Sequence, residues 1–207
     1  MLIACCLPIG GFAQYSMQEM GVSLGAGVGL FPNTQKVALG PAVSAEYFFS
    51  HYACGKAYGL HFTGGVNAAF PMDGSSGEWI DQLGTKSSLQ VIGVDFGAYG
   101  KIRLHEYHRP KEWAVFLGPK IMVPLVAKYS TDLGSGSLSS TSLSVNRILP
   151  GIHLSMQFRR AIKKQSWFLE PGVEYYFNPL FQSWGGGNVT QAQVFLKFSY
   201  AFWDQRG

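Results

Sequence analysis

The amino-acid sequence predicts an all-β fold, an eight-stranded antiparallel up-and-down transmembrane β-barrel. Three observations lead to it: the scatter of the apolar residues, the alternation within the strands and the placement of the aromatic rings. Charged residues make up 14% of the chain, against about 25% in an average soluble domain. A membrane-spanning helix needs about 20 apolar residues in a row. The longest stretch without Asp, Glu, Lys or Arg runs from Tyr175 to Leu196, and Asn, Gln, Ser and Thr interrupt it. The apolar residues are therefore spread along strands.

Eight segments alternate between two kinds of side chain. Residues 22–31 alternate Val, Leu and Ala with Ser and Gly, and residues 92–104 alternate apolar residues with Gly, Asp, Tyr, Lys and Arg. A period of two indicates a strand whose two faces differ chemically. The remaining strands are predicted at 42–52, 57–70, 113–129, 147–158, 167–177 and 191–203.

One face of these strands holds apolar residues, Gly and Pro, and the other face carries charge. We expect the charged side chains to fill the lumen and to pair with one another, because lone ions in a low dielectric are very costly. This polar network consists of Glu46, Asp95, Lys101, Arg103, Lys120, Lys128, Glu170, Glu174 and Lys197. The alternation alone also fits a soluble sandwich or barrel, whose polar face would meet water.

Two further features favour a membrane barrel. The first, third, fifth and seventh predicted connections are long and the others short, as in barrels with long extracellular loops and short periplasmic turns. Aromatic residues gather at both ends of the apolar face, which the two membrane interfaces favour. We expect a periplasmic girdle of Phe49, Trp113, Phe158, Trp167 and Phe202, and an opposite girdle of Phe70, Tyr129, Tyr175 and Phe177.

The first residues have the character of a secretion signal. Leu2 to Ile9 is apolar, and Gly11-Phe12-Ala13 offers the small residues that signal peptidase prefers. We expect residues 1–13 to be a signal peptide whose positive n-region is missing, and residues 14–207 to form an outer-membrane β-barrel domain. The alternative is a lipobox, Leu2-Ile3-Ala4-Cys5, with Cys5 lipidated. With the signal removed in the periplasm, both termini would be periplasmic and the long loops extracellular.

Two stretches resemble a known family. FLGPKIMVPLVAKYS at 116–130 and AEYFFSHYACGKAYGLHFTGGVNAAF at 45–70 are similar to strands of the outer-membrane β-barrel domain family of porin-like and OmpA-like small barrels. The strand AQVFLKFSYAFW, which ends on an aromatic residue, is also typical of that family. The resemblance implies a barrel in the outer membrane of the Gram-negative cell envelope, and it leaves the role of the barrel open.

For function, we expect a structural or partner- or ligand-binding barrel with a largely filled polar lumen, because eight strands leave an interior that side chains can just fill. A narrow porin-like channel lined by the same residues is the alternative.

The expected partners are outer-membrane lipid and lipopolysaccharide, the barrel-assembly machinery, and an envelope or secretion-complex partner bound by loops 71–87 or 131–146. We expect no nucleic acid, because basic residues do not gather on one face. We expect no metal or cofactor, since no Cys/His spacing resembles a metal site.

A lipid A-modifying hydrolase is a further alternative. Small outer-membrane barrels that deacylate lipid A use a His-x-Ser pair with an acid nearby, and His153 and Ser155 have this spacing, with Glu170 and Glu174 on the following strand. Met156 stands where that family has Asn after the Ser. The alternation also turns His153 and Ser155 into the lumen, away from acyl chains. We therefore expect no catalytic residues.

Overall fold

The computed structural model describes residues 16–32, 37–53, 57–70, 87–104, 111–132, 138–142, 146–162, 165–180 and 190–204. Its strands run in chain order as β1 Ser16–Pro32, β2 Val37–Ala53, β3 Tyr58–Ala69, β4 Ser87–Arg103, β5 Lys111–Asp132, β6 Leu138–Ser142, β7 Leu149–Ile162, β8 Gln165–Tyr176 and β9 Gln191–Asp204. No helix in these ranges is long and apolar enough to cross a membrane.

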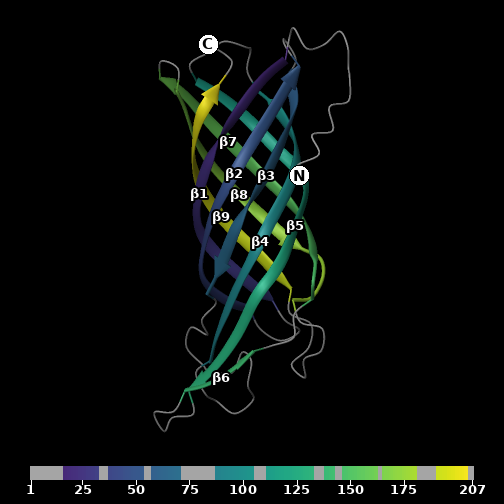
Figure 1. The fold of residues 1–207 in the computed structure, drawn as a ribbon, viewed down its shortest axis with the longest axis vertical. Coiled ribbons are helices and arrows are strands. Elements are labelled where there is room, and N and C mark those ends of the chain that lie inside the picture. Colours follow the sequence, from purple (N-terminus) through teal and green to yellow (C-terminus); the bar gives the residue numbers. More distant parts are fainter. Residues whose placement is uncertain are drawn as a thin grey trace, which may run out of the picture.

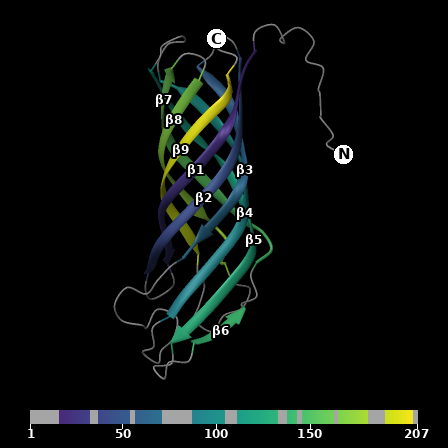
Figure 2. The ribbon, with the colours of Figure 1, turned by 60° about the vertical axis from the view of Figure 1, so that its left-hand side comes forward.

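All strands except β6 close into one barrel. Each strand pairs antiparallel with its neighbour in the sequence, β5 pairs with β7, and β1 pairs with β9 to complete the circle (Figures 1 and 2). The closed eight-stranded antiparallel barrel confirms the predicted fold class. Because Glu19 lies opposite Asp204 in the register, both described ends of the chain lie at one end of the barrel. We call this the terminal end and the opposite one the loop end.

The first connection is shorter than predicted. Strand β1 continues to Pro32 and β2 begins at Val37, so the long first loop expected between residues 31 and 42 is wrong. Pro41 is compatible with a paired strand because β2 pairs with β3 only from Ala42 onward. The carbonyl of Pro41 still accepts a hydrogen bond of 2.9 Å from the Phe70 amide, and the N–H that proline lacks is not needed at the end of a ladder.

The predicted loop 131–146 contains a strand. Strand β5 runs on to Asp132, and its last residues, 128–132, pair with β6. The first residues of β4 pair with the same part of β5, which places Ser87 opposite Thr131. Strands β4, β5 and β6 thus form a short sheet that extends past the other strands at the loop end (Figure 1). The five residues of β6, LSSTS, are too few and too polar to give a clear alternation.

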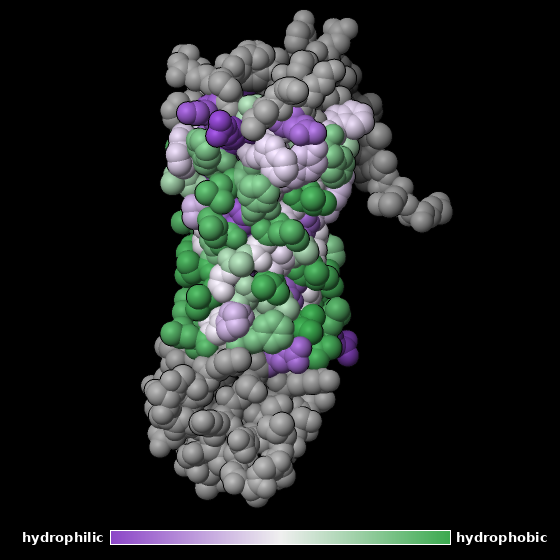
Figure 3. Space-filling view, turned by 90° about the vertical axis from the view of Figure 1, so that its left-hand side faces the viewer, coloured by the Kyte–Doolittle hydropathy of each residue, from purple (hydrophilic) through white to green (hydrophobic). Residues whose placement is uncertain are grey.

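The two faces of the barrel are the reverse of those of a soluble protein. Large apolar side chains point outward and are exposed, among them Leu24 at 65%, Phe96 at 55% and Phe198 at 51%. Charged side chains point inward and are buried, such as Lys120 and Asp95, each at 1%. Figure 3 shows, on one face, that apolar side chains predominate over the middle of the barrel and that hydrophilic residues lie toward its two ends. The structure therefore decides what the alternation alone left open, because a soluble barrel would place its apolar face inside.

Gly64 and Gly65, neighbours on β3, differ in how closely the adjacent strand packs against them. A Cβ on Gly65 would lie 2.6 Å from the Glu46 Cα and closer still to the Ala45 carbonyl oxygen, both on the backbone of β2. A Cβ on Gly64, on the outer face, would meet the Phe96 ring at 3.5 Å and the Asp95 carbonyl oxygen at 3.9 Å, both ordinary van der Waals distances. Strand β2 approaches so closely at Gly65 that no side chain fits between the two strands.

We predict that Gly65→Ala lowers the free energy of unfolding by about 1–3 kcal/mol, the usual cost of overpacking. Gly64→Ala is the matched control and should leave the free energy of unfolding nearly unchanged. Urea unfolding of the two variants in lipid vesicles, followed by tryptophan fluorescence, measures both values. Equal effects of the two substitutions would contradict the close approach at Gly65.

Candidate functional site

The inside of the barrel is the candidate site, because it collects the predicted polar network. Of the nine predicted residues, eight have described side chains, and each of these is at most 5% exposed: Glu46, Asp95, Lys101, Arg103, Lys120, Glu170, Glu174 and Lys197. The side chain of Lys128 lies outside the described set. Seven of the eight side chains fall into a central cluster and a second cluster at the terminal end, and Glu170 contacts His153, Ser155 and Gln157.

The central cluster is built around Lys120 on β5. Its Nζ lies 3.1 Å from Glu46 Oε1, 3.0 Å from Asp95 Oδ2 and 2.8 Å from Glu174 Oε1. Lys197 on β9 lies 2.9 Å from Glu46 Oε2 and 3.3 Å from Glu174 Oε1. The carboxylates come from β2, β4 and β8. The two ammonium groups therefore connect five strands across the lumen.

Asn67 and Gln193 extend the central cluster toward the loop end. The Asn67 amide donates to Asp95 Oδ2 at 3.1 Å and to Gln193 Oε1 at 2.9 Å. The Gln193 amide donates back to Asn67 Oδ1 at 3.1 Å. The two side-chain amides thus donate hydrogen bonds to each other's oxygens, which offsets the cost of burying these polar groups.

The second cluster lies at the terminal end. Lys101 Nζ is 3.3 Å from Glu19 Oε2, and Arg103 Nε is 3.0 Å from Glu112 Oε1. Arg159 reaches Glu19 at 3.6 Å and Glu112 at 3.8 Å. The Arg103 guanidinium also lies 3.8 Å from the centre of the Tyr52 ring, which is the geometry of a cation–π contact.

Stacked rings lie among these charges. Phe48 stacks on His61 with 5.5 Å between ring centres, His61 on Tyr99 at 5.9 Å, Tyr99 on His153 at 4.1 Å and His153 on Phe195 at 5.3 Å. The rings come from strands β2, β3, β4, β7 and β9, so the stack crosses the lumen. Phe116 packs edge-on against His61 and Phe168 packs edge-on against Phe48.

Apolar side chains close the loop end of the lumen. Phe31, Val91, Met122, Leu149 and Tyr176 form one buried cluster, and none is more than 2% exposed. They stand on β1, β4, β5, β7 and β8. From the terminal end to the loop end, the described interior therefore consists of the second cluster, the ring stack, the central cluster and the apolar layer.

His153 and Ser155 lie as close to each other and to a carboxylate as the members of a catalytic triad do, but Ser155 donates its proton to Glu170, and both side chains lack the access of a triad. His153 Nε2 lies 2.9 Å from Ser155 Oγ, and His153 Nδ1 lies 3.0 Å from Glu174 Oε1. Ser155 Oγ also donates to Glu170 Oε1 at 2.7 Å. Both side chains are inside the barrel, with Ser155 4% exposed and His153 fully buried against Tyr99. A triad serine must reach the carbonyl that it attacks, and here rings and carboxylates surround it.

Several interior residues were missed by the sequence analysis because the predicted strands were too short. Glu19 lies upstream of the predicted start of the first strand, Glu112 directly precedes the fifth, and Arg159 directly follows the sixth. All three keep the inward phase of their strands. If the alternation had been followed a few residues beyond the predicted ends of these strands, it would have predicted that these three side chains face the lumen. Among the described residues, no three His, Cys, Asp or Glu side chains are arranged to hold a metal ion.

The predicted girdle residues with described side chains lie on the outer face. At the terminal end Trp113 contacts Phe158 with 4.9 Å between ring centres, Phe49 contacts Phe62 at 6.5 Å and Phe202 contacts Tyr47 at 6.0 Å. Trp167 contacts Tyr200 at 4.7 Å. At the loop end Tyr175 contacts Phe177 at 5.6 Å, and Phe70 is half-buried. The side chain of Tyr129 lies outside the described set.

Solved structures are similar to this arrangement. OprG from Pseudomonas aeruginosa, an outer membrane protein, matches with a TM-score of 0.50 and 11% sequence identity, over 90% of this chain and 95% of that chain. This is the fold of the small outer-membrane barrels. Neisserial surface protein A matches with a TM-score of 0.49, 15% identity and coverage of 88% and 97%. Ail, the attachment invasion locus protein of Yersinia pestis, matches with a TM-score of 0.47, 16% identity and coverage of 89% and 98%. Neither a protein-family model nor a curated protein matches the chain.

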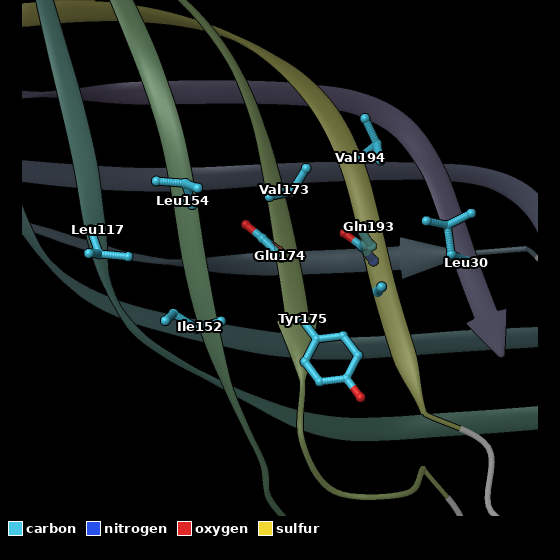
Figure 4. Close-up of a pocket in the computed structure, with 10 residues that line it drawn as sticks. Leu30, Leu117, Ile152, Leu154, Val173, Glu174, Tyr175, Gln193 and Val194 are labelled. Carbon is cyan, nitrogen blue, oxygen red and sulfur yellow. The ribbon is translucent and has the colours of Figure 1, made fainter. Parts of the chain in front are cut away.

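The outside of this small barrel has a shallow apolar hollow of about 300 Å³. Leu117, Leu154, Val173 and Tyr175 line it across β5, β7 and β8, as Figure 4 shows. Among its lining residues only Glu174 and Gln193 belong to the inner face. The hollow is therefore part of the apolar outer surface and not a mouth of the lumen.

We predict that Lys120→Met destabilises the barrel by about 3–5 kcal/mol, because it leaves three buried carboxylates without their shared cation. Lys111→Met makes the same chemical change at an exposed position of the same strand and should cost less than about 0.5 kcal/mol. Urea unfolding in vesicles compares the two variants. A Lys120→Met barrel as stable as the Lys111→Met barrel would show that the central cluster is not a dry ionic core.

Proposed function

We propose that this protein is an outer-membrane barrel with a closed lumen, which acts as a rigid scaffold and presents its loop end to a partner. The observation that carries the proposal is the contact of one buried ammonium, Lys120 Nζ, with three carboxylates within 3.1 Å. In such a cluster each charged group contacts one of opposite sign, as in a structural core and unlike the free charges that line a conduction path.

The membrane location rests on the outer surface. The exposed apolar side chains on all eight barrel strands would be unstable in water, and a closed barrel leaves no unpaired strand edge in the hydrocarbon. Rings that contact one another at the terminal end and at the loop end border this surface, as the two interfaces of a bilayer favour. OprG, whose fold is similar, is an outer membrane protein. With a cleaved secretion signal, the terminal end is periplasmic and the loop end is extracellular.

A narrow channel is less well supported than a closed barrel. An ion that crosses the lumen would have to part Lys120 from Glu174, whose atoms lie 2.8 Å apart. It would also have to pass the ring stack, in which Tyr99 and His153 are 4.1 Å apart between centres. Parting a buried ion pair leaves uncompensated charge at a cost of several kcal/mol.

A lipid A hydrolase is also less well supported. The hydrogen bonds of Ser155 and His153 hold the two side chains in the ionic core. Acyl chains would meet the opposite face of β7, where Leu154 and Met156 are exposed. The nucleophile and its substrate would thus be on different sides of the sheet.

The loop end is the part of the scaffold that we assign to partner binding. Loops on a rigid framework commonly carry binding function, and the sheet of β4, β5 and β6 extends beyond the barrel there. Of the two loops predicted to bind partners, 71–87 leads in sequence into β4 and 131–146 includes β6.

We predict that the folded protein gives no conductance steps in planar lipid bilayers. A shift between heated and unheated samples on gels, together with co-flotation with vesicles, controls for folding and insertion. A steady conductance whose ion selectivity changes in Glu174→Gln would contradict the closed lumen and favour the channel.

A further inference from the structure

Among the residues that the structure describes, the outer surface of the barrel carries charge of one sign. Every acidic residue whose side chain the structure describes is buried in the lumen: Glu19, Glu46, Asp95, Glu112, Glu170 and Glu174. The exposed charged side chains in the same set are all cations, namely Lys111, Arg147 and Arg160. Two of these three stand together.

Lys111 and Arg160 are direct partners in the register of β5 and β7. Directly opposite residues on one face have Cβ atoms about 5 Å apart, and like charges in these positions destabilise a sheet. No described carboxylate pairs with either cation. Their chain neighbours Glu112 and Arg159 point inward, where they lie 3.8 Å from each other. The barrel therefore holds two cations side by side at its terminal end, neither of them paired with a carboxylate of the described residues.

From the two cations toward the middle of the barrel, the outward-facing residues change in chemical character step by step. The next outward pair in the register is Trp113 and Phe158, whose ring centres are 4.9 Å apart, and the pair after that is Val115 and Met156. On its other side Arg160 lies opposite Trp167 of β8. From the rim of the barrel toward its middle, the surface thus changes from cationic to aromatic to aliphatic.

A phospholipid has the same series of groups along its length. The phosphate of its headgroup is anionic, the glycerol and ester region lies where Trp and Tyr are enriched in membrane proteins, and the acyl chains are aliphatic. A lysine supplies a mobile point charge and an arginine supplies a planar fork that can bind phosphate oxygens in pairs. Both cations can therefore contact one phosphate while the acyl chains lie over Trp113, Phe158 and Met156.

We propose that Lys111 and Arg160 form a binding site for the headgroup of an anionic phospholipid. The site rests on the proposed function, because it requires the barrel to be inserted with its terminal end in the phospholipid leaflet. A headgroup of net negative charge is favoured over a zwitterionic one, since the ammonium of the latter would meet two cations. A soluble anion lacks the acyl chains that the aromatic and aliphatic rows contact.

The chain offers a matched control for this site. Arg147 is exposed as Arg160 is, but it precedes β7 at the loop end. No described acid pairs with it, and it precedes the paired residues of β7, so it has no cation opposite it in the register. Replacing Arg147 removes one surface cation from the barrel without touching the proposed site.

The experiment measures which lipid stays with the barrel. The full chain is folded into vesicles of equal parts phosphatidylglycerol and phosphatidylcholine, extracted in mild detergent and examined by native mass spectrometry for bound lipid. We expect phosphatidylglycerol to be enriched over phosphatidylcholine on the unmodified protein. The enrichment should fall by about fivefold for each cation removed, in Lys111→Gln, Arg160→Gln and their double variant. Arg147→Gln should retain it.

The outcomes separate the site from the proposed function. Enrichment that survives in the double variant, or that Arg147→Gln reduces equally, overturns the site while the inserted barrel stands. A protein that enters no vesicle overturns both the membrane location and the site. Loss of enrichment in the double variant alone, with normal insertion and gel shift, supports the site.

Discussion

The contact of Lys120 with Glu46, Asp95 and Glu174 is the constraint on which the barrel interior depends. One ammonium on β5 meets carboxylates from β2, β4 and β8, and Lys197 on β9 shares two of them. A single-residue slip of any of these strands would turn its charged side chain to the outer face. The cluster thus fixes the register of strands that are not neighbours in the sheet. Buried ion pairs contribute little net stability by themselves, so its main effect is specificity of pairing.

The same cluster explains why the outer surface can be so uniform. Because the described acidic side chains all lie in the lumen and pair with cations there, the outward positions between the two rims can be apolar. Rings then mark the ends of the apolar band, and cations appear only beyond them. The interior behaves as a soluble core does in packing, with Tyr99, Phe116 and Phe168 almost fully buried, although its polarity is inverted.

The alternation of the sequence was sufficient to predict the barrel and the inward phase of Glu46, Lys120 and Glu174, because a period of two is a property of neighbouring residues. It was not sufficient to predict where strands end. The first two strands were predicted at 22–31 and 42–52, whereas Pro32 and Pro41 also lie in paired strands, since a proline at the end of a ladder is compatible with pairing. Strand β6 forms only because β5 extends far enough to pair with it, and its own five residues show no clear alternation that would predict a strand. The ring stack joins residues from five strands, so its existence depends on the closed structure and not on any local pattern.

The central claim is that water does not reach the middle of the lumen, and the reactivity of introduced thiols tests it most directly. Ser155 and Ser199 are 4% and 1% exposed on the inner face, and each can be replaced by Cys in a chain whose Cys5, Cys6 and Cys54 are changed to Ser. Gln165→Cys, at an exposed position of β8, is the reactive control. In the folded barrel a water-soluble maleimide should label Gln165→Cys at once and label Ser155→Cys and Ser199→Cys only after unfolding. Labelling of either inner thiol in the folded barrel as fast as that of the control would contradict a closed lumen.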